Sequence, residues 1–207
     1  VLGGDFLDCA SLSSFVKDKS TKPFSDELAE GGTLLGWLLL EFSHSEFVYI
    51  MGNHEERIER YLRLHAPEIA DLSNFTLPAL LSSHTDGRIK FVNVREEGGA
   101  GYSIIPGWWA FHGHELGICP VASPAKRYMD KLRCNFVVGH IHKKDSITVS
   151  SGFYDRIFKG YSVGTLAKRS PHYLPINDWI NGFAVLEVSS DGKSGKTFHN
   201  YHFEYGD

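Results

Sequence analysis

Short apolar runs alternate with longer segments of helical periodicity in the first half of the chain. Residues 1–2 and 47–51 are expected to end buried strands, because each run is apolar and stops at glycine. Between them, Ser25 is the expected N-cap of a helix that the Gly31-Gly32 pair could break in two. The predicted core-facing stripe of this helix consists of apolar residues at helical spacing, namely Leu34, Leu35, Leu38, Leu39 and Phe42. A second helix is expected from about residue 54.

Strand-like patterns dominate the second half. Strands are expected over 89–94, 102–105, 108–111, 135–138, 147–150, 161–163, 183–188 and 197–205. Ser123-Pro124 predicts a helix start, and Asp191-Gly192 predicts the turn of a hairpin between the last two strands. The pattern favours an α/β fold with helices outside two packed sheets, formed by a single domain over residues 1–207.

Composition excludes several classes of protein. The 207 residues include 21 Gly and 8 Pro without a repeat period, which excludes a collagen-like chain. The longest apolar run, over 34–42, is too short to span a bilayer, so no membrane partner is expected. A net charge of -4 leaves no broad basic surface for long duplex DNA. Three cysteines without paired spacing indicate a reducing compartment, and we expect a cytoplasmic protein.

Four predicted strands end in loops that carry Asp, Asn or His. The motifs are GDxxD, GNHE, HGH and GHxH, and they contain Asp5, Asp8, Asn53, His54, His112, His114, His140 and His142. Taken singly, the first motif could be a turn and the second a helix N-cap. Eleven histidines are about twice the average usage, however, and two histidines separated by one residue point to the same side of an extended segment. Mixed Asp, Asn and His donors without Cys indicate a divalent ion such as Mn, Fe, Zn or Co.

In this order, the motifs resemble those of the calcineurin-like metallophosphoesterase superfamily over about residues 4–142. The resemblance implies a four-layer α/β/β/α sandwich of two packed mixed sheets. It also implies two divalent metal ions, with Mn favoured and Fe, Zn, Co or Ni as alternatives. By the resemblance, Asp5 bridges both metals, the second metal is held by Asn53, His112 and His140, and the first is held by His142.

The resemblance also assigns catalytic roles. His54 would be an unligated histidine that donates to the phosphoryl or leaving-group oxygen, and Asp8 would fix its tautomer. His114 could orient the neighbouring ligand or touch the substrate, or it could be an exposed polar residue. Arg57 and Glu55 could reach phosphate, or they could belong to a solvated first turn of the helix.

The implied reaction is hydrolysis of a phosphate ester, either a monoester or a diester, by a hydroxide that bridges the two metals. The substrate could be a nucleotide or a nucleic acid, and the oligomeric state is left open. The protein-phosphatase branch of the superfamily continues GDxxD with Arg-Gly. Here Cys9-Ala10 follows instead, which argues against a Ser/Thr protein phosphatase.

One motif of the superfamily is missing. An Asp-x-His pair on the first strand normally supplies two more ligands to the first metal, but no such pair precedes Asp5. Because Val1-Leu2-Gly3 resembles the superfamily's second strand, we expect that the first strand is absent from this chain. The alternative interpretation is a non-catalytic binding module that keeps the sandwich fold.

Overall fold

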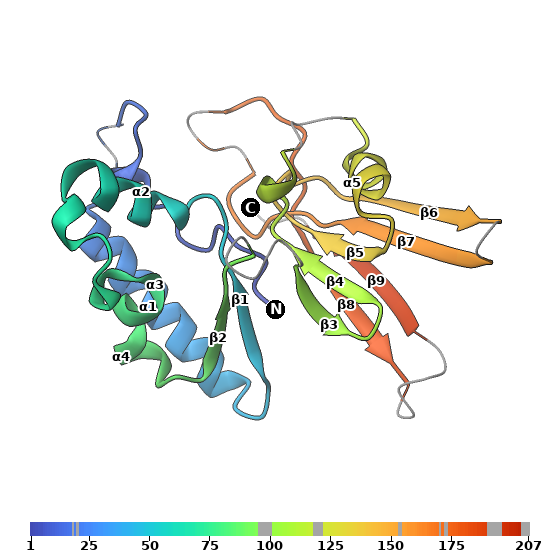
Figure 1. Cartoon of the computed structure of the whole chain (residues 1–207), viewed down its shortest axis with the longest axis horizontal. Coiled ribbons are helices and arrows are strands. Elements are labelled where there is room, and N and C mark those ends of the chain that lie inside the picture. Colours follow the sequence, from blue (N-terminus) through green and yellow to red (C-terminus); the bar gives the residue numbers. More distant parts are fainter. Residues whose placement is uncertain are drawn as a thin grey trace. The chain divides into compact units, whose positions relative to one another are not determined.

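The computed structural model divides the chain into two compact units, Val1–Ala100 and Gly101–Asp207 (Figure 1). It describes residues 1–17, 19, 21–94, 101–117, 122–152, 155–169, 171, 174–189 and 196–203. Among these residues, no helix combines the length and the apolar character that crossing a bilayer requires. The expectation of a single domain over residues 1–207 stays a prediction.

The first unit places helices beside a small parallel sheet (Figure 1). Strand β1 (Phe47–Ile50) pairs in parallel with β2 (Ile89–Val92), and Leu2 adds a parallel bridge to Tyr49 of β1. The helical elements are η1 (Ala10–Leu12), α1 (Phe24–Glu41), α2 (Glu56–His65), η2 (Pro67–Ile69), η3 (Ser73–Phe75), α3 (Leu77–Leu80) and α4 (Ser82–Thr85). The buried strand predicted at residues 1–2 is present only as this single bridge at Leu2, and Val1 is 61% exposed.

Helix α1 runs unbroken through its two adjacent glycines, so the break that they could have caused does not occur. Both glycines allow close packing instead. A Cβ on Gly31 would lie 2.4 Å from Leu7 Cδ2, and one on Gly32 would lie 2.4 Å from the His84 ring. The predicted N-cap was wrong: α1 begins at Phe24, and Ser25 lies inside its first turn. The reason is that the preceding proline has a fixed φ and starts the helix without a side-chain cap.

The predicted apolar stripe of α1 was too wide. Leu35 and Leu39 are buried in the core of the first unit, together with Tyr49. Leu34 is 47% exposed and Phe42 is 51% exposed. Leu34 lies about 100° around the helix from Leu35, and Phe42 follows the last helical residue with a non-helical backbone. Neither residue therefore shares the buried face.

The second unit is built on a five-stranded mixed sheet with the order β3-β4-β5-β7-β6 and a separate β8-β9 hairpin. The strands are β3 (Tyr102–Ile105), β4 (Trp108–Phe111), β5 (Asn135–Val138), β6 (Asp145–Ser151), β7 (Arg156–Ser162), β8 (Gly182–Val188) and β9 (Lys196–His202). The helical elements are η4 (His114–Leu116) and α5 (Pro124–Leu132). Strands β4, β5 and β7 are parallel, and antiparallel β3 and β6 form the edges.

Helix α5 and the hairpin cover opposite faces of this sheet. Phe136 of β5 packs against Tyr128 of α5, with ring centroids 6.1 Å apart. Side chains of the other face include Trp108 and Tyr161, because neighbouring residues alternate between faces and the strands are in register. Both rings stack on Phe198 of β9, at 5.6 and 3.8 Å. The second unit therefore has a helix, a sheet and a hairpin in layers.

The α/β class and the helix start at Ser123-Pro124 are confirmed. Asp145 supplies the cap of α5, because its Oδ2 accepts from Ser123 Oγ at 2.9 Å and from the Ala125 N–H at 3.0 Å. Strands β8 and β9 form the predicted hairpin. The expected turn at residues 191–192 lies outside the described residues.

Candidate functional site

Asp5 is held in an unusual conformation by its surroundings in the first unit. Its φ of 54° is left-handed, which costs a non-glycine residue about 1 kcal/mol. Gly52 makes room for it, because a Cβ there would lie 2.2 Å from Asp5 Oδ1. The same oxygen accepts the backbone N–H of His54 at 3.0 Å. The carboxylate of Asp5 is thus fixed against the segment that leads into α2.

Glu55 anchors this loop, a role that the sequence did not reveal. It is 1% exposed, so the interpretation of Glu55 as a solvated or phosphate-reaching residue was wrong. Its Oε2 accepts the N–H groups of Asp5 and Gly52 at 3.0 and 2.8 Å. Its Oε1 accepts the Leu7 N–H at 3.1 Å and the Tyr49 hydroxyl at 2.6 Å. Burial first, and then the charge of Glu55, hold the pKa of Tyr49 well above 10.0, so the phenol remains a donor.

The bond from Gly52 to Glu55 is the one contact of this set that a sequence signal could have indicated. A Glu that reaches back three residues to a backbone N–H resembles half of a capping box. The other three donors are the N–H groups of Asp5 and Leu7 and the hydroxyl of Tyr49. Two of them lie far along the chain and the third lies on a strand, so no local sequence pattern predicts these contacts.

His54 and Asp8 form the pair that was predicted. His54 Nδ1 lies 2.9 Å from Asp8 Oδ1, and because a carboxylate only accepts, Nδ1 carries the proton. The hydrogen bond with His54, and beyond it the charge of Arg57, hold the pKa of Asp8 below its ordinary value of 3.8 against the effect of burial. His54 Nε2 is turned the other way and lies 3.7 Å from Asp5 Oδ2.

Arg57 is bound to Asp8 rather than solvated. Its Nη1 donates to the Asp8 carbonyl oxygen at 2.7 Å and to Asp8 Oδ1 at 3.0 Å. The Arg57 side chain is 16% exposed. Asn53, the predicted amide ligand, lies partly buried between Gly52 and His54. The first unit therefore gathers five predicted site residues around the start of α2, namely Asp5, Asp8, Asn53, His54 and Arg57.

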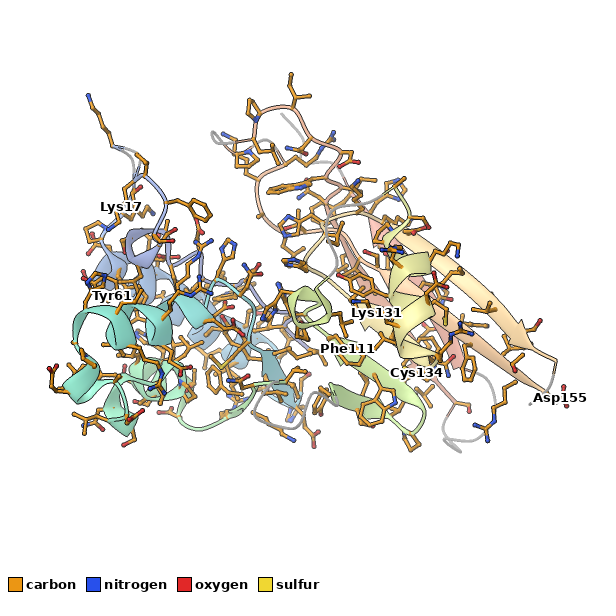
Figure 2. All side chains as sticks on the ribbon, turned by 45° about the horizontal axis from the view of Figure 1, so that its top comes forward. Lys17, Tyr61, Phe111, Lys131, Cys134 and Asp155 are labelled. Carbon is orange, nitrogen blue, oxygen red and sulfur yellow. The ribbon has the colours of Figure 1, made fainter. Side chains whose placement is uncertain are left out.

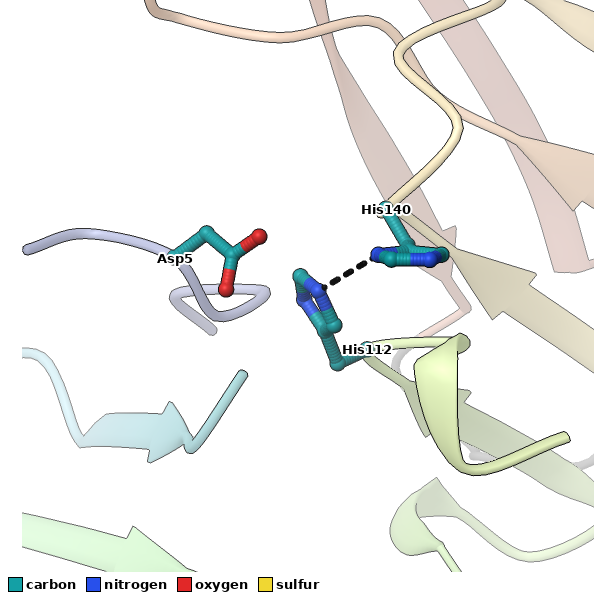
Figure 3. Close-up of side chains that lie close together, drawn as sticks. All are labelled: Asp5, His112 and His140. Atoms are coloured by element: carbon teal, nitrogen blue, oxygen red, sulfur yellow. Dashed lines mark hydrogen bonds between the residues drawn. The ribbon is translucent and has the colours of Figure 1, made fainter. Parts of the chain in front are cut away.

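Three histidines from two loops pack together in the second unit. His112 is 1% exposed and follows β4, while His140 follows the neighbouring parallel strand β5. His112 Nε2 lies 3.1 Å from His140 Nδ1, as the dashed line in Figure 3 marks. The ring centroid of His114 lies 5.2 Å from that of His112 and 6.1 Å from that of His140. The HGH and GHxH motifs thus meet at the carboxyl ends of adjacent strands.

The spacing of the two ring nitrogens fits a shared metal ion. Two nitrogens at about 2.05 Å from one ion are separated by about 2.9 Å in octahedral and about 3.3 Å in tetrahedral coordination. The observed distance of 3.1 Å lies between these values. The donor set, with imidazole nitrogens and no thiolate, suits Mn, Fe, Zn, Co or Ni.

Glu115 holds the loop that carries His112 and His114. Its Oε2 accepts the Gly113 N–H at 2.7 Å and lies 3.2 Å from His114 Nδ1. Burial raises the pKa of Glu115, but hydrogen bonds from His114 and from the backbone outweigh it and hold that pKa below 4.5. The His114 side chain is 9% exposed, so the alternative that His114 is an exposed polar residue was wrong. Lys131, which extends from α5 in Figure 2, donates to the Leu116 carbonyl oxygen and ties η4 to that helix.

His142 is positioned by a segment that sequence reasoning missed. Its ring meets Trp179 edge-on, with centroids 4.3 Å apart. The Ile180 N–H donates to the His142 carbonyl oxygen at 2.9 Å, and Lys143 forms an ion pair with Asp178. His142 also has a left-handed backbone with φ 60°, as His140 does with φ 53°. No sequence spacing links Trp179 to the GHxH motif.

Comparisons with known proteins found two relatives among phage proteins. The chain is 30% identical over 154 residues to the Gene 54 protein of Mycobacterium phage L5. The aligned segment covers 70% of this chain and 57% of that protein. It is 25% identical over 155 residues to the Gene 54 protein of Mycobacterium phage D29, covering 68% of this chain and 56% of that protein. The chain thus spans somewhat more than half the length of these curated relatives. No family model matches the sequence, and no solved structure matches it.

Proposed function

We propose that the protein is a metal-dependent phosphoesterase that hydrolyses monoesters or diesters. The observation that carries this proposal is the arrangement around His54. Asp8 holds Nδ1 at 2.9 Å, and the opposite nitrogen faces the carboxylate of Asp5 at 3.7 Å. A histidine that one carboxylate orients, beside a second carboxylate in a left-handed backbone, is typical of a reaction centre.

Two divalent ions, with Mn favoured, would be held by Asp5, Asn53, His112, His140 and His142. Three of these residues, Asp5, His140 and His142, have left-handed backbones. Strain of this kind persists where the surroundings over-determine a conformation, as they do at binding sites. When bound, the metals would supply a hydroxide nucleophile near neutral pH and offset charge on the phosphoryl oxygens.

The residues of the chain have separate tasks in this proposal. His54, with protons on both nitrogens, donates the Nε2 proton to the leaving-group oxygen. Asp8 keeps the ring oriented and stabilises its positive charge through Nδ1. Glu55 and Gly52 keep the carboxylate of Asp5 in place before substrate arrives. A rigid arrangement of this kind avoids reorganisation during the reaction.

The proposal includes a four-layer α/β/β/α sandwich as the fold of the protein. A four-layer sandwich is supported by the presence of a sheet with helices beside it in each unit. A cytoplasmic location and a nucleotide or nucleic-acid substrate stay predictions of the sequence.

His54→Ala tests the proposal. Wild-type protein with added Mn should hydrolyse bis-p-nitrophenyl phosphate or p-nitrophenyl phosphate, and His54→Ala should keep its metal while turnover falls by about 10²–10⁴-fold. Metal analysis of the same preparations separates the two effects, and His44→Ala, at an exposed histidine, is the control. Loss of metal from His54→Ala would show that His54 is a ligand. Wild-type protein without metal or turnover would favour the non-catalytic binding module.

A further inference from the structure

A small cavity opens on the first unit beside Asn53. Its volume is about 100 Å³, and its polar and aromatic lining residues are Ser13, Ser14, Phe15, Asn53, Arg57 and Arg60. A water molecule occupies about 30 Å³ of liquid, and pockets for whole ligands measure about 300–1,000 Å³. The cavity therefore has room for one group of the size of a phosphate, but not for a complete nucleotide.

The chemistry of the lining favours an anion. Arg57 and Arg60 lie three residues apart on α2 and therefore on one side of the helix. Among the described residues, no acidic side chain lines the cavity. Ser13 Oγ accepts the Phe15 N–H at 3.1 Å, which leaves the hydroxyl hydrogen available to donate. Guanidinium and hydroxyl donors around one small space are suited to phosphate oxygens.

Arg60 differs from the arginine that follows it on the same helix. Arg63 is engaged by Glu59 at 2.8 Å and by Asp71 at 3.1 Å. For Arg60, the described part of the chain contains no such ion pair, and the residue is exposed. Arg57 is fixed by Asp8, so one guanidinium is preorganised and the other is available to a ligand.

The cavity adjoins the proposed reaction centre through residues of the same unit. Asn53 precedes His54, and Arg57 is bound to the carboxylate that orients His54. We infer that this cavity binds a second phosphate group of the substrate, next to the one that reacts. Phe15, which is 77% exposed at the rim, offers a face for a base and favours a nucleotide as the carrier of that phosphate. This inference rests on the proposed function and narrows its substrate to phosphorylated nucleotide esters.

Binding can be tested without turnover. Inorganic pyrophosphate is titrated into full-length ¹⁵N-labelled protein in the presence of EDTA, and amide shifts are followed by NMR. We expect saturable shifts at residues 13–15, 53 and 60, and affinity about fivefold weaker in Arg60→Ala but unchanged in Arg63→Ala. Ser14→Ala provides a second variant in the loop. Shifts spread over all basic residues, or equal weakening by Arg63→Ala, would overturn the inference.

Turnover distinguishes this inference from the proposed function. Thymidine dinucleotides with and without a 5′-phosphate are compared, and the phosphorylated one should have a KM about fivefold lower in wild-type protein but not in Arg60→Ala. Equal KM values for both dinucleotides would contradict the second-phosphate site alone. Localised pyrophosphate binding without hydrolysis of any ester would support that site and contradict the proposed hydrolysis alone.

Discussion

In both units, a Glu side chain helps to hold the loop that carries the candidate site residues, but the partners of the two Glu side chains lie at different sequence separations. In each, a Glu with a little-exposed side chain directly follows a His, and its carboxyl group accepts a backbone N–H of the same loop. Glu115 has its partners within two residues, at Gly113 and His114. Glu55 accepts four donors, and it joins the Asp5 loop to β1 and to the start of α2. Glu55 therefore acts through tertiary contacts, whereas Glu115 acts through local ones.

We expect the largest loss of stability from removal of the Glu55 carboxylate. Glu55→Ala leaves four donors without their acceptor in a buried region, so we expect a loss of about 3–5 kcal/mol in the free energy of unfolding. Urea denaturation followed by circular dichroism measures the loss. Glu59→Ala, at an exposed ion pair on the same helix, should cost less than about 0.5 kcal/mol. A loss below about 1 kcal/mol in Glu55→Ala would contradict the tertiary role.

Glu115→Gln should have a smaller and pH-dependent effect. The pKa of Glu115 is lowered in the folded protein, so its stabilisation is fully present above pH 4.5 and is lost as the pH falls through the lower folded-state value. We expect Glu115→Gln to cost about 1–2 kcal/mol at pH 7 and progressively less below pH 4.5. Hydrogen exchange in peptides covering residues 101–117 follows this change, with Asp130→Asn on α5 as the control. A cost that does not change with pH would exclude ionisation of Glu115 as its source.

Local patterns predicted the elements well, and tertiary contacts explain the errors. The apolar run before Gly52 predicted β1, and Ser123-Pro124 predicted the start of α5. Ser25 was wrongly assigned as an N-cap because a preceding proline starts α1. Leu34 was wrongly assigned to the core because the stripe of leucines is wider than the buried face of the helix.

For the site, the resemblance carried by the motifs indicated the pairing of His54 with Asp8 and the meeting of His112 with His140. They did not indicate Glu55 or Trp179, whose partners lie far along the chain or follow no periodicity. The cavity at Arg60 depends on a loop at residues 13–15 that has no recognisable pattern.

Metal content in variants of each unit tests the central claim most directly. In the proposed function, Asp5 and His140 are both metal ligands. Mn bound per chain is measured after equilibrium dialysis for wild-type protein, Asp5→Ala and His140→Ala, with circular dichroism as a check on folding. We expect wild-type protein to bind Mn and each variant alone to lose it. Wild-type Mn content in either folded variant would contradict the assignment of that residue as a metal ligand.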